Sequence, residues 1–412
     1  MYSKKVFLSA MAFAAAVSTS SLSFAQERIS DRDRPDYKRD GINVGGFTLS
    51  PQATLQEKHD DNIYSANTGE VDDMITTIAP SLTLDSNWNN HSLSFYTNAD
   101  VNIYADETDE NYTDYAVGFN GRADILRDTF LSAGVEYQEL HEDRGSPDST
   151  NNSVEPTEYN EFTANVGFFR GLRKLSFSLD SEFRDLDFKD GNTNSGANID
   201  NDDRDRQILK NSARVGYEFI PNYQAFVAGS VNNREYDNIS ATNRNSDGYD
   251  ISVGTSVNLT GKARGEVSVG YMEQDYDSST LKDVDGVAYG ASLLWNPTQL
   301  TSVNFGINRS IEETTIANSS AYIATTYSAE IEHEFMRNVI LAGNVSLSEN
   351  DYESSNAIAR EDEIISVGAD VRYLIHRNVS TNLGYTYTER SSNQLNQDYD
   401  KNIVMLGLDV GF

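Results

Sequence analysis

The chain of 412 residues contains no cysteine and half as many basic as acidic residues. Without cysteine, a disulfide framework, a thiol nucleophile, a thiolate metal site and a lipoprotein anchor are all excluded. Lys and Arg number 32 against 64 Asp and Glu, so the formal net charge is −32. Such an acidic surface makes nucleic acid an unexpected partner. After residue 25, no apolar run approaches the roughly 18 residues of a membrane helix, which excludes a helical membrane protein.

The first 25 residues have the features of a secretory signal peptide. Lys4 and Lys5 precede an apolar stretch from Val6 to Val17, and Ser23 and Ala25 stand three and one residues before a plausible cleavage point. Removing residues 1–25 takes away these two lysines, so the mature charge becomes −32 − 2 = −34. We therefore expect an exported protein.

Most of the mature chain alternates apolar and polar residues with a period of two, which is typical of β-strands with two different faces. The 23 Tyr and 18 Phe argue against disorder, because disordered segments contain few aromatic residues. The alternation predicts about eighteen strands, with sixteen as the alternative. Their expected ranges are 44–59, 72–85, 91–106, 111–125, 129–143, 156–169, 173–187, 204–219, 223–237, 245–259, 263–277, 284–295, 299–313, 319–333, 338–352, 360–373, 378–392 and 398–412.

The predicted connections alternate between short turns and longer acidic loops. Short turns are expected at positions such as 170–172, 220–222 and 296–298, and longer loops at positions such as 142–155 and 189–203. This arrangement is typical of a transmembrane antiparallel up-and-down β-barrel of the bacterial outer membrane. A propeller with a repeat of about forty residues is the alternative, but its blades would need turns about every ten residues. We expect an all-β fold.

The chain ends in Phe412, on an alternating strand that includes Leu408 and Val410. A terminal aromatic residue on such a strand resembles the assembly signal of outer-membrane barrels. With an even strand number both termini lie on the periplasmic side, so the short turns are expected there and the acidic loops outside. The predicted organisation is a signal peptide (1–25), a periplasmic N-terminal segment (26–42) and the barrel (43–412).

The segment 26–42 lacks alternation and mixes basic and acidic residues evenly. One interpretation is a solvated tail, because chain termini are commonly unordered. The other is a segment that docks in the lumen or on a periplasmic partner. The sequence leaves both open.

Catalytic chemistry has little support, and we expect no enzyme, cofactor or metal centre. None of the five histidines has a zinc-ligand spacing. His141, flanked by Glu139 and Glu142, is the best candidate for an outer-membrane lipid hydrolase, but no nucleophile can be named beside it. The acidic run Asp200–Asp205 lacks the glycine and the distal glutamate of an EF-hand, and is interpreted as a solvated loop where divalent cations could bridge to lipopolysaccharide.

The polar faces of the strands are expected to line the lumen, because inward and outward residues alternate in a barrel. Most of this face is Ser, Asn, Thr and Gly, which suits either a hydrated polymer or a water-filled wall. The candidate lumen-lining charges are Asp100, Arg122, Glu136, Asp180, Glu182, Arg184, Arg214, Arg264, Glu266, Asp370 and Arg372.

The first predicted hairpins resemble a known family. Asp60-Asp61-Asn62, followed by Ile63-Tyr64, and the stretch around Pro80 are similar to the outer-membrane β-barrel porins associated with exopolysaccharide biosynthesis and export clusters. The likeness is greatest over 43–130 and continues as a strand pattern to the end. The resemblance implies an outer-membrane barrel linked to polysaccharide secretion, and it implies no catalytic residues.

Three functions follow as expectations. The first is a channel that assists exopolysaccharide export or the diffusion of polar solutes, with a preference for cations if the lumen is open. The second is a closed structural or adhesive barrel, and the remote third is the lipid hydrolase. Expected partners are outer-membrane lipids, lipopolysaccharide, the barrel-assembly machinery, polysaccharide and periplasmic export components.

Overall fold

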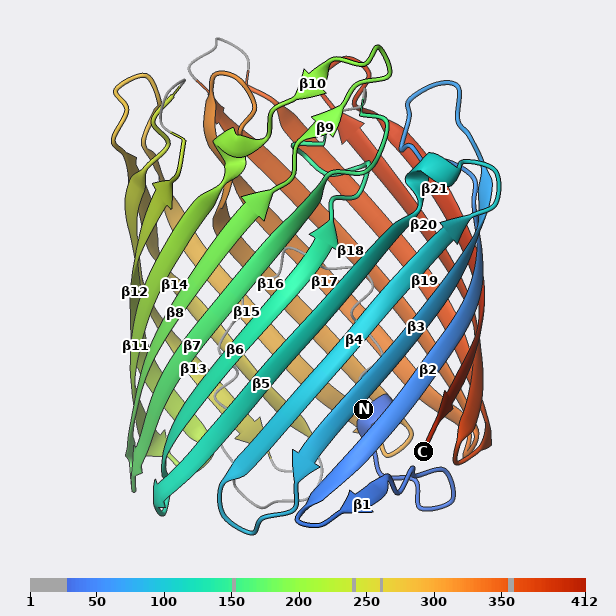
Figure 1. Ribbon diagram of the computed structural model, residues 1–412. Coiled ribbons are helices and arrows are strands. Elements are labelled where there is room, and N and C mark those ends of the chain that lie inside the picture. Colours follow the sequence, from blue (N-terminus) through green and yellow to red (C-terminus); the bar gives the residue numbers. More distant parts are fainter. Residues whose placement is uncertain (1–27, 150–152, 239–241, 260–261, 355–358) are drawn as a thin grey trace.

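The protein is a closed antiparallel β-barrel of eighteen long strands, as seen in a computed structural model that describes residues 28–149, 153–238, 242–259, 262–354 and 359–412 (Figure 1). The predicted signal peptide lies outside the described residues. The barrel strands are β2 (Phe47–Asp60), β3 (Asp73–Ser86), β4 (Ser92–Tyr104), β5 (Tyr112–Leu126), β6 (Thr129–His141), β7 (Glu158–Leu172), β8 (Leu175–Phe188), β11 (Arg206–Ile220), β12 (Tyr223–Tyr236), β13 (Ser246–Leu259), β14 (Ala263–Tyr276), β15 (Val284–Thr298), β16 (Thr301–Glu313), β17 (Ser319–Met336), β18 (Val339–Ser354), β19 (Glu361–His376), β20 (Val379–Ser392) and β21 (Tyr399–Gly411).

Each strand pairs with its neighbours in the sequence, and the first strand pairs with the last. The β2–β21 ladder runs from Gln52 opposite Gly411 to Asp60 opposite Ile403, so the sheet has no free edge along this ladder. The alternation therefore predicted the fold class and all eighteen strands. Every boundary of these eighteen strands lies within three residues of its predicted position.

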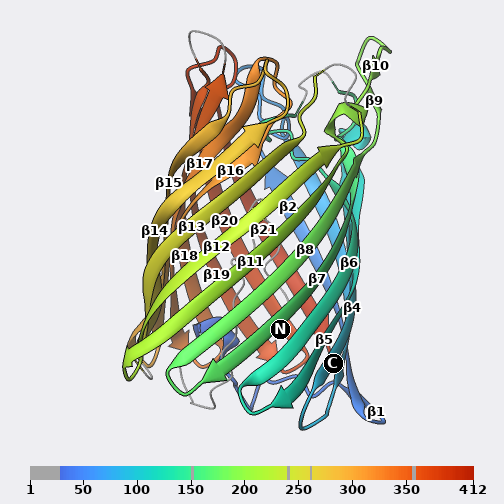
Figure 2. The same cartoon turned by 90° about the vertical axis from the view of Figure 1, so that its left-hand side faces the viewer.

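The two faces of the wall differ as a membrane barrel requires. The outward face is apolar and exposed, as at Val227, Val253, Val267 and Leu406, whose side chains are 51–58% exposed. The inward face carries polar and small residues, with some large side chains such as Phe226 among them. Figures 1 and 2 show the strands tilted around a common axis, with the long loops at one end and short turns at the other. We call these the long-loop end and the short-turn end.

The short turns depend on residues that accept a left-handed backbone. Asp128, Arg173 and Asn222 have φ values of +56°, +45° and +70°, and Asp and Asn adopt this conformation more readily than most residues. Two predicted turns are wrong: residues 170–172 belong to β7, and residues 296–298 belong to β15. Pro297, which suggested a turn, is instead accommodated by a register shift between Trp295 and Thr298, since proline donates no ladder hydrogen bond.

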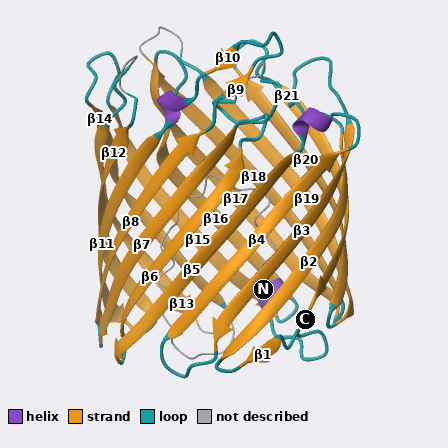
Figure 3. Ribbon diagram, viewed as in Figure 1, coloured by secondary structure: helices purple, strands orange, loops and turns teal. Residues whose placement is uncertain are grey.

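The remaining elements are short. They are β1 (Ile42–Val44), which pairs with β2, the β9 (Gly191–Asn192) and β10 (Asn198–Ile199) hairpin, and the 3-10 helices η1 (Ile29–Asp31), η2 (Thr108–Glu110) and η3 (Asp202–Arg204). Figure 3 shows η2 and η3 among the loops and η1 near the opposite end. Among the described residues, no helix has the length and apolarity needed to cross a membrane.

Candidate functional site

The connection between β6 and β7 folds across the long-loop end of the barrel. We call its described residues, 142–149 and 153–157, the crossing loop. Its root is fixed by two buried ion pairs. Arg144 binds both carboxylate oxygens of Glu110, with Nε 2.9 Å from Oε2, and Arg204 binds Glu142 at 2.6 and 3.0 Å. Both arginine side chains are less than a tenth exposed.

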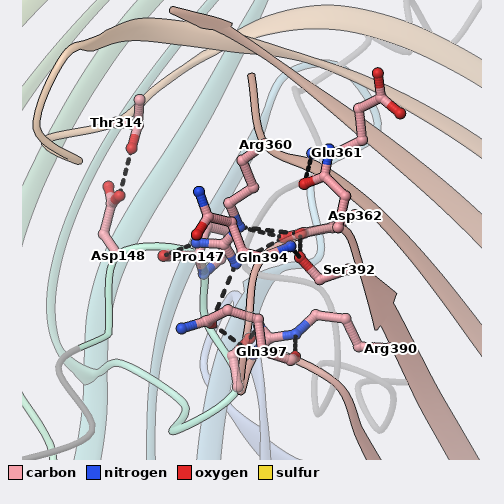
Figure 4. Close-up of polar contacts among 12 residues, drawn as sticks. Pro147, Asp148, Thr314, Arg360, Glu361, Asp362, Arg390, Ser392, Gln394 and Gln397 are labelled. Atoms are coloured by element: carbon pink, nitrogen blue, oxygen red, sulfur yellow. Dashed lines mark hydrogen bonds and ion pairs between the residues drawn. The ribbon is translucent and has the colours of Figure 1, made fainter. Parts of the chain in front are cut away.

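The tip of the crossing loop reaches the opposite wall. Arg390 donates from Nη1 to the Gly145 carbonyl at 2.9 Å, and Arg360 donates from Nη1 to the Pro147 carbonyl at 3.3 Å (Figure 4). The Asp148 carboxylate accepts hydrogen bonds from the Thr314 hydroxyl and, at 3.3 Å, from the Thr315 amide. Those partners lie beside β16–β20, on the far side of the barrel from β6 and β7. The loop therefore bridges the mouth.

Aromatic side chains lie on the inner wall around the crossing loop. Ring pairs are formed by Tyr112 with His141 at 3.5 Å, Tyr159 with Phe188 at 4.9 Å and Tyr322 with Tyr352 at 4.9 Å between centroids. Guanidinium groups cover several rings: Arg204 over Phe188 at 4.1 Å, Arg360 over Tyr352 at 4.9 Å and Arg390 over Tyr399 at 4.7 Å. Such surfaces attract both the apolar faces and the polar edges of ring-shaped solutes.

The predicted lining residues lie on the concave side of the wall. The clearest case is Arg214 on β11, which binds Glu266 on β14 at 2.9 and 2.7 Å and lies 3.6 Å over the Phe226 ring. Two strands separate these partners, and only a concave surface brings them together. This ion pair joins two members of the predicted set.

Other predicted lining residues have partners that the sequence analysis did not name. Arg184 binds Glu161 at 2.9 and 3.1 Å, Arg122 binds Asp124 at 2.9 Å, and Glu136 accepts hydrogen bonds from Tyr96 and Gln138. By strand alternation the same face carries Asp100, Asp180, Glu182, Arg264, Asp370 and Arg372. Glu161 could have been found from the sequence, because it lies on the same face of β7 as Tyr159 and Thr163.

The start of the N-terminal segment lies on the inner wall at the short-turn end, so the interpretation as a solvated tail is wrong for residues 28–34. Ile29 is fully buried, and its amide donates to the Ser302 hydroxyl at 3.0 Å. Strand alternation places Glu330, Glu332 and Glu334 of β17 on one face. They bind Arg28 at 3.0 Å, the Ser30 amide at 3.0 Å and Arg34 at 3.1 Å, in that order.

The same segment then crosses to the closing strands, where Arg39 binds Asp409 and Arg377 binds Asp40 at 3.0 Å. The basic and acidic residues of this segment thus form ion pairs with residues of the barrel. Figures 1 and 2 show the described N-terminus inside the barrel, near the short-turn end.

The Asp60-Asp61-Asn62 motif fastens the first strand to the last at the long-loop end. Asp60 forms an ion pair with Lys401 at 2.9 Å, and Asp61 accepts hydrogen bonds from the backbone and side-chain amides of Asn402 at 2.6 and 2.8 Å. Asn62 is fully buried and donates to the carbonyl of Asp400 at 2.9 Å. The motif therefore stabilises the junction between the first and last strands of the barrel.

Pro80 has a different place in the first hairpins. It lies on β3 opposite Ala53 of β2, while the ladder from β3 to β4 skips from Ile78 to Ser81. Because proline has no amide hydrogen, it interrupts this ladder.

His141 does not have the predicted surroundings of a hydrolase. Its Nδ1 lies 2.9 Å from Asp114, and its Nε2 lies 3.6 Å from Asp143. Glu142 binds Arg204 instead, and Glu139 binds Tyr115 and Lys189. Within the described residues, no serine or threonine hydroxyl is seen to hydrogen-bond with the imidazole, so the geometry gives the hydrolase hypothesis no support.

The acidic run contributes to a small exposed cluster. Carboxylate oxygens of Asp190, Asp200 and Asp202 lie within 4.8 Å of one another. Their mutual repulsion raises the pKa of Asp202, with Asp190 as the main cause and Asp200 next. Exposed carboxylates commonly gather without an ion, and the cluster carries no functional assignment.

Several solved structures are similar to this chain. OccAB3 of Acinetobacter baumannii is similar with 12% identity and a TM-score of 0.47, over 90% of this chain and 100% of that chain. OpdO of Pseudomonas aeruginosa is similar with 13% identity and a TM-score of 0.46, over 90% and 98%. OpdK of Pseudomonas aeruginosa, solved with vanillate, is similar with 10% identity and a TM-score of 0.45, over 88% and 99%.

A comparison with curated protein sequences gives no match. A family match covers residues 34–412, which is the entire barrel and the end of the N-terminal segment. The strand pattern, the closed barrel and this match together place the protein among the outer-membrane β-barrel porins. The chain belongs to the family described as "Putative beta-barrel porin 2".

Proposed function

We propose that the protein is a passive channel for polar solutes, and that hydrated saccharides, including exopolysaccharide chains, are the solute class it serves. The observation that carries this proposal is the concave wall, where charged and amide side chains face one another across several strands. Asp100, Glu182, Arg184, Arg214 and their neighbours then line the path of the solute. The acidic long-loop end faces the cell exterior, and the short turns face the periplasm.

The inner surface around the crossing loop supports saccharides among polar solutes. Stacked tyrosines and covering guanidinium groups suit the apolar ring faces and the hydroxyl edges of sugars. The Tyr352 hydroxyl is buried and has no hydrogen-bond partner within the described residues. It is therefore available to a solute that displaces the tip of the crossing loop.

Ion current through the protein in a planar lipid bilayer tests this proposal. Neutral oligosaccharides of increasing length should block the current of single channels, while glycerol at the same mass concentration should not. A reversal potential in a salt gradient should show cation preference, strongest at low salt, where the Debye length is about 30 Å at 0.01 M. If current flows but no saccharide blocks it, the protein is a channel and saccharides are not its solutes.

A closed structural barrel is the second candidate, and one observation favours it. The crossing loop spans one end and the N-terminal segment packs inside the other, so both ends carry fixed elements. In that case the loops would act at the cell surface, through lipopolysaccharide or other cells. Complete absence of current, even after deletion of residues 143–149, would favour this function over the channel.

The remaining partners are proposed on the same basis. Outer-membrane lipids contact the apolar outward face, and the barrel-assembly machinery recognises the strand that ends at Phe412. Periplasmic export components would meet the N-terminal segment at the short-turn end.

A further inference from the structure

The ladder between β15 and β16 stops before either strand ends. The pairing runs from Thr298 opposite Thr301 to Gly290 opposite Asn308. Beyond that point β15 continues to Val284, paired with β14, and β16 continues to Glu313, paired with β17. Two strand edges, 284–289 and 309–313, are therefore not paired with each other at the long-loop end.

The top of the β16–β17 hairpin is folded inward at this point. We call residues 309–325 the flap. Ile323 and Ala321 are buried in one apolar cluster with Met272, Tyr276 and Val284 of β14 and β15. Met272 lies on the inward face, because it is six residues from Glu266 on β14, whose carboxylate binds Arg214 across the concave wall. The flap thus packs against the inside of the neighbouring wall.

Strand alternation assigns the same flap residues to the outside. Ile323 and Ile331 are eight residues apart on β17, so a regular strand would place both on the lipid face. Ile331 is 50% exposed there, whereas Ile323 is 5% exposed inside. The β17 strand therefore changes its relation to the barrel surface between these two residues.

Polar contacts hold the flap in its inward position. Glu313 binds Arg234 and accepts a hydrogen bond from the Tyr236 hydroxyl at 2.6 Å. Arg244, which is buried, donates from Nη1 to the carbonyls of Thr314 at 2.7 Å and Ser319 at 3.0 Å. The crossing loop docks on this same flap through Asp148.

We propose that the flap is a gate in the barrel wall. In its second position β16 continues its existing register onto β15, which places Ser310 opposite Ala288 and Ile311 opposite Val287. Ile311 and Ile323 then face lipid, at little cost, because lipid tails are as apolar as the protein interior. This movement withdraws Thr314 and Thr315 from Asp148 and widens the mouth, an inference that rests on the proposed channel function.

The charges explain why the inward position is preferred. In the continued register Glu313 would lie opposite Asp285, and like charges directly opposite each other destabilise a sheet. In the inward position Glu313 has Arg234 as its partner. The resting channel is therefore the narrower form.

Disulfide trapping tests the gate directly, because the protein contains no cysteine of its own. In an Ala288→Cys/Ser310→Cys variant, the continued register brings the two Cα atoms to about 4.5–5.5 Å, within the range that a disulfide requires. We expect the disulfide to form under mild oxidation and to raise the single-channel conductance severalfold, reversibly on reduction. Ala291→Cys/Ile307→Cys, a pair already opposite each other, is the matched control, which should cross-link without changing the conductance.

Gly286→Cys/Ile323→Cys provides the opposite trap. A Cβ atom at Gly286 would lie 3.6 Å from the Cδ1 atom of Ile323, so the two thiols lie within reach of a short bifunctional thiol reagent, which should hold the flap inward and keep the conductance low. If the Ala288→Cys/Ser310→Cys variant fails to cross-link while the control pair does, the gate is overturned. Because cross-linking is read on a gel, this outcome is distinct from failure of the channel proposal itself, which would appear as efficient trapping with no current in any variant.

Discussion

Replacing Asn62 by alanine should weaken the junction between the first and last strands. The side chain donates from Nδ2 to the carbonyls of Ala66 and Asp400, both at 2.9 Å, and its Oδ1 accepts from the Ala66 amide at 2.8 Å. A hydrogen bond contributes about 0.5–1.5 kcal/mol net, so the three together give about 1.5–4.5 kcal/mol. Because the long-loop end borders water, which can rehydrate the freed groups, we expect a loss near 2 kcal/mol.

The assay is the free energy of unfolding in urea, in lipid vesicles, followed by the loss of the heat-modifiable band on gels. Asn62→Asp is a second variant of nearly the same shape. It retains the acceptor toward Ala66 but turns a carboxylate oxygen toward two carbonyl oxygens, so it should destabilise at least as much. Asn198→Ala, in the exposed β9–β10 hairpin, is the control and should change the free energy by less than about 0.5 kcal/mol. If Asn62→Ala and the control have the same free energy of unfolding, Asn62 does not stabilise the junction between the first and last strands.

Three further predictions concern the ends of the barrel. Deleting residues 28–40 should raise the conductance, with Glu332→Gln giving a smaller rise, and an unchanged current would show that the segment does not obstruct the lumen. Burial raises the pKa of the Asp205 carboxyl to about 6, so the folded state binds this proton more tightly and the adjoining loop should lose stability as pH rises from about 4 to about 6. Amide exchange of that loop, corrected for its intrinsic pH dependence, should show this loss, and Asp205→Asn should abolish it. Deleting Phe412 should lower the folded yield in the outer membrane much more than Gly411→Ala, and equal yields would remove its role as an assembly signal.

The sequence predicts the barrel wall well because each strand is specified by its own alternation. A shift of one residue would turn every apolar side chain to the wrong face, so the pattern fixes both the strands and their orientation. The Asn-Pro step at 296–297 predicted a turn that does not form, since a register shift accommodates the proline inside β15. The preference of Asn and Pro for a turn was outweighed there by the pairing of β15 with β14 and β16.

The site was harder to predict, because its contacts join residues far apart in the chain. Asp148 and Thr314 are 166 residues apart, and Ile29 and Ser302 are 273 apart. Nothing local in the crossing loop indicates that it folds inward. The flap was hidden for a related reason: its alternation is regular, and only the missing β15–β16 pairs reveal that Ile323 lies inside.

The Asp-Asp-Asn motif shows a third situation. In the sequence the motif stands out only through a family resemblance, which gives it no physical role. The role depends on β21, which lies at the other end of the chain but next to β2 in space. A short motif of acceptors is therefore explained only when the closure of the barrel is known.

Single-channel conductance of an Arg360→Ala/Arg390→Ala variant tests whether the crossing loop restricts the channel. These two side chains hold the Pro147 and Gly145 carbonyls of the crossing loop, so their removal should free its tip. Arg127→Ala, on a short turn and with a 96% exposed side chain, is the control, and the heat-modifiable band verifies folding in each case. We expect a low conductance for the unaltered protein and the control, and a severalfold higher conductance for the double variant. A folded double variant with the same current as the unaltered protein, or with no current at all, would contradict a channel that the crossing loop restricts.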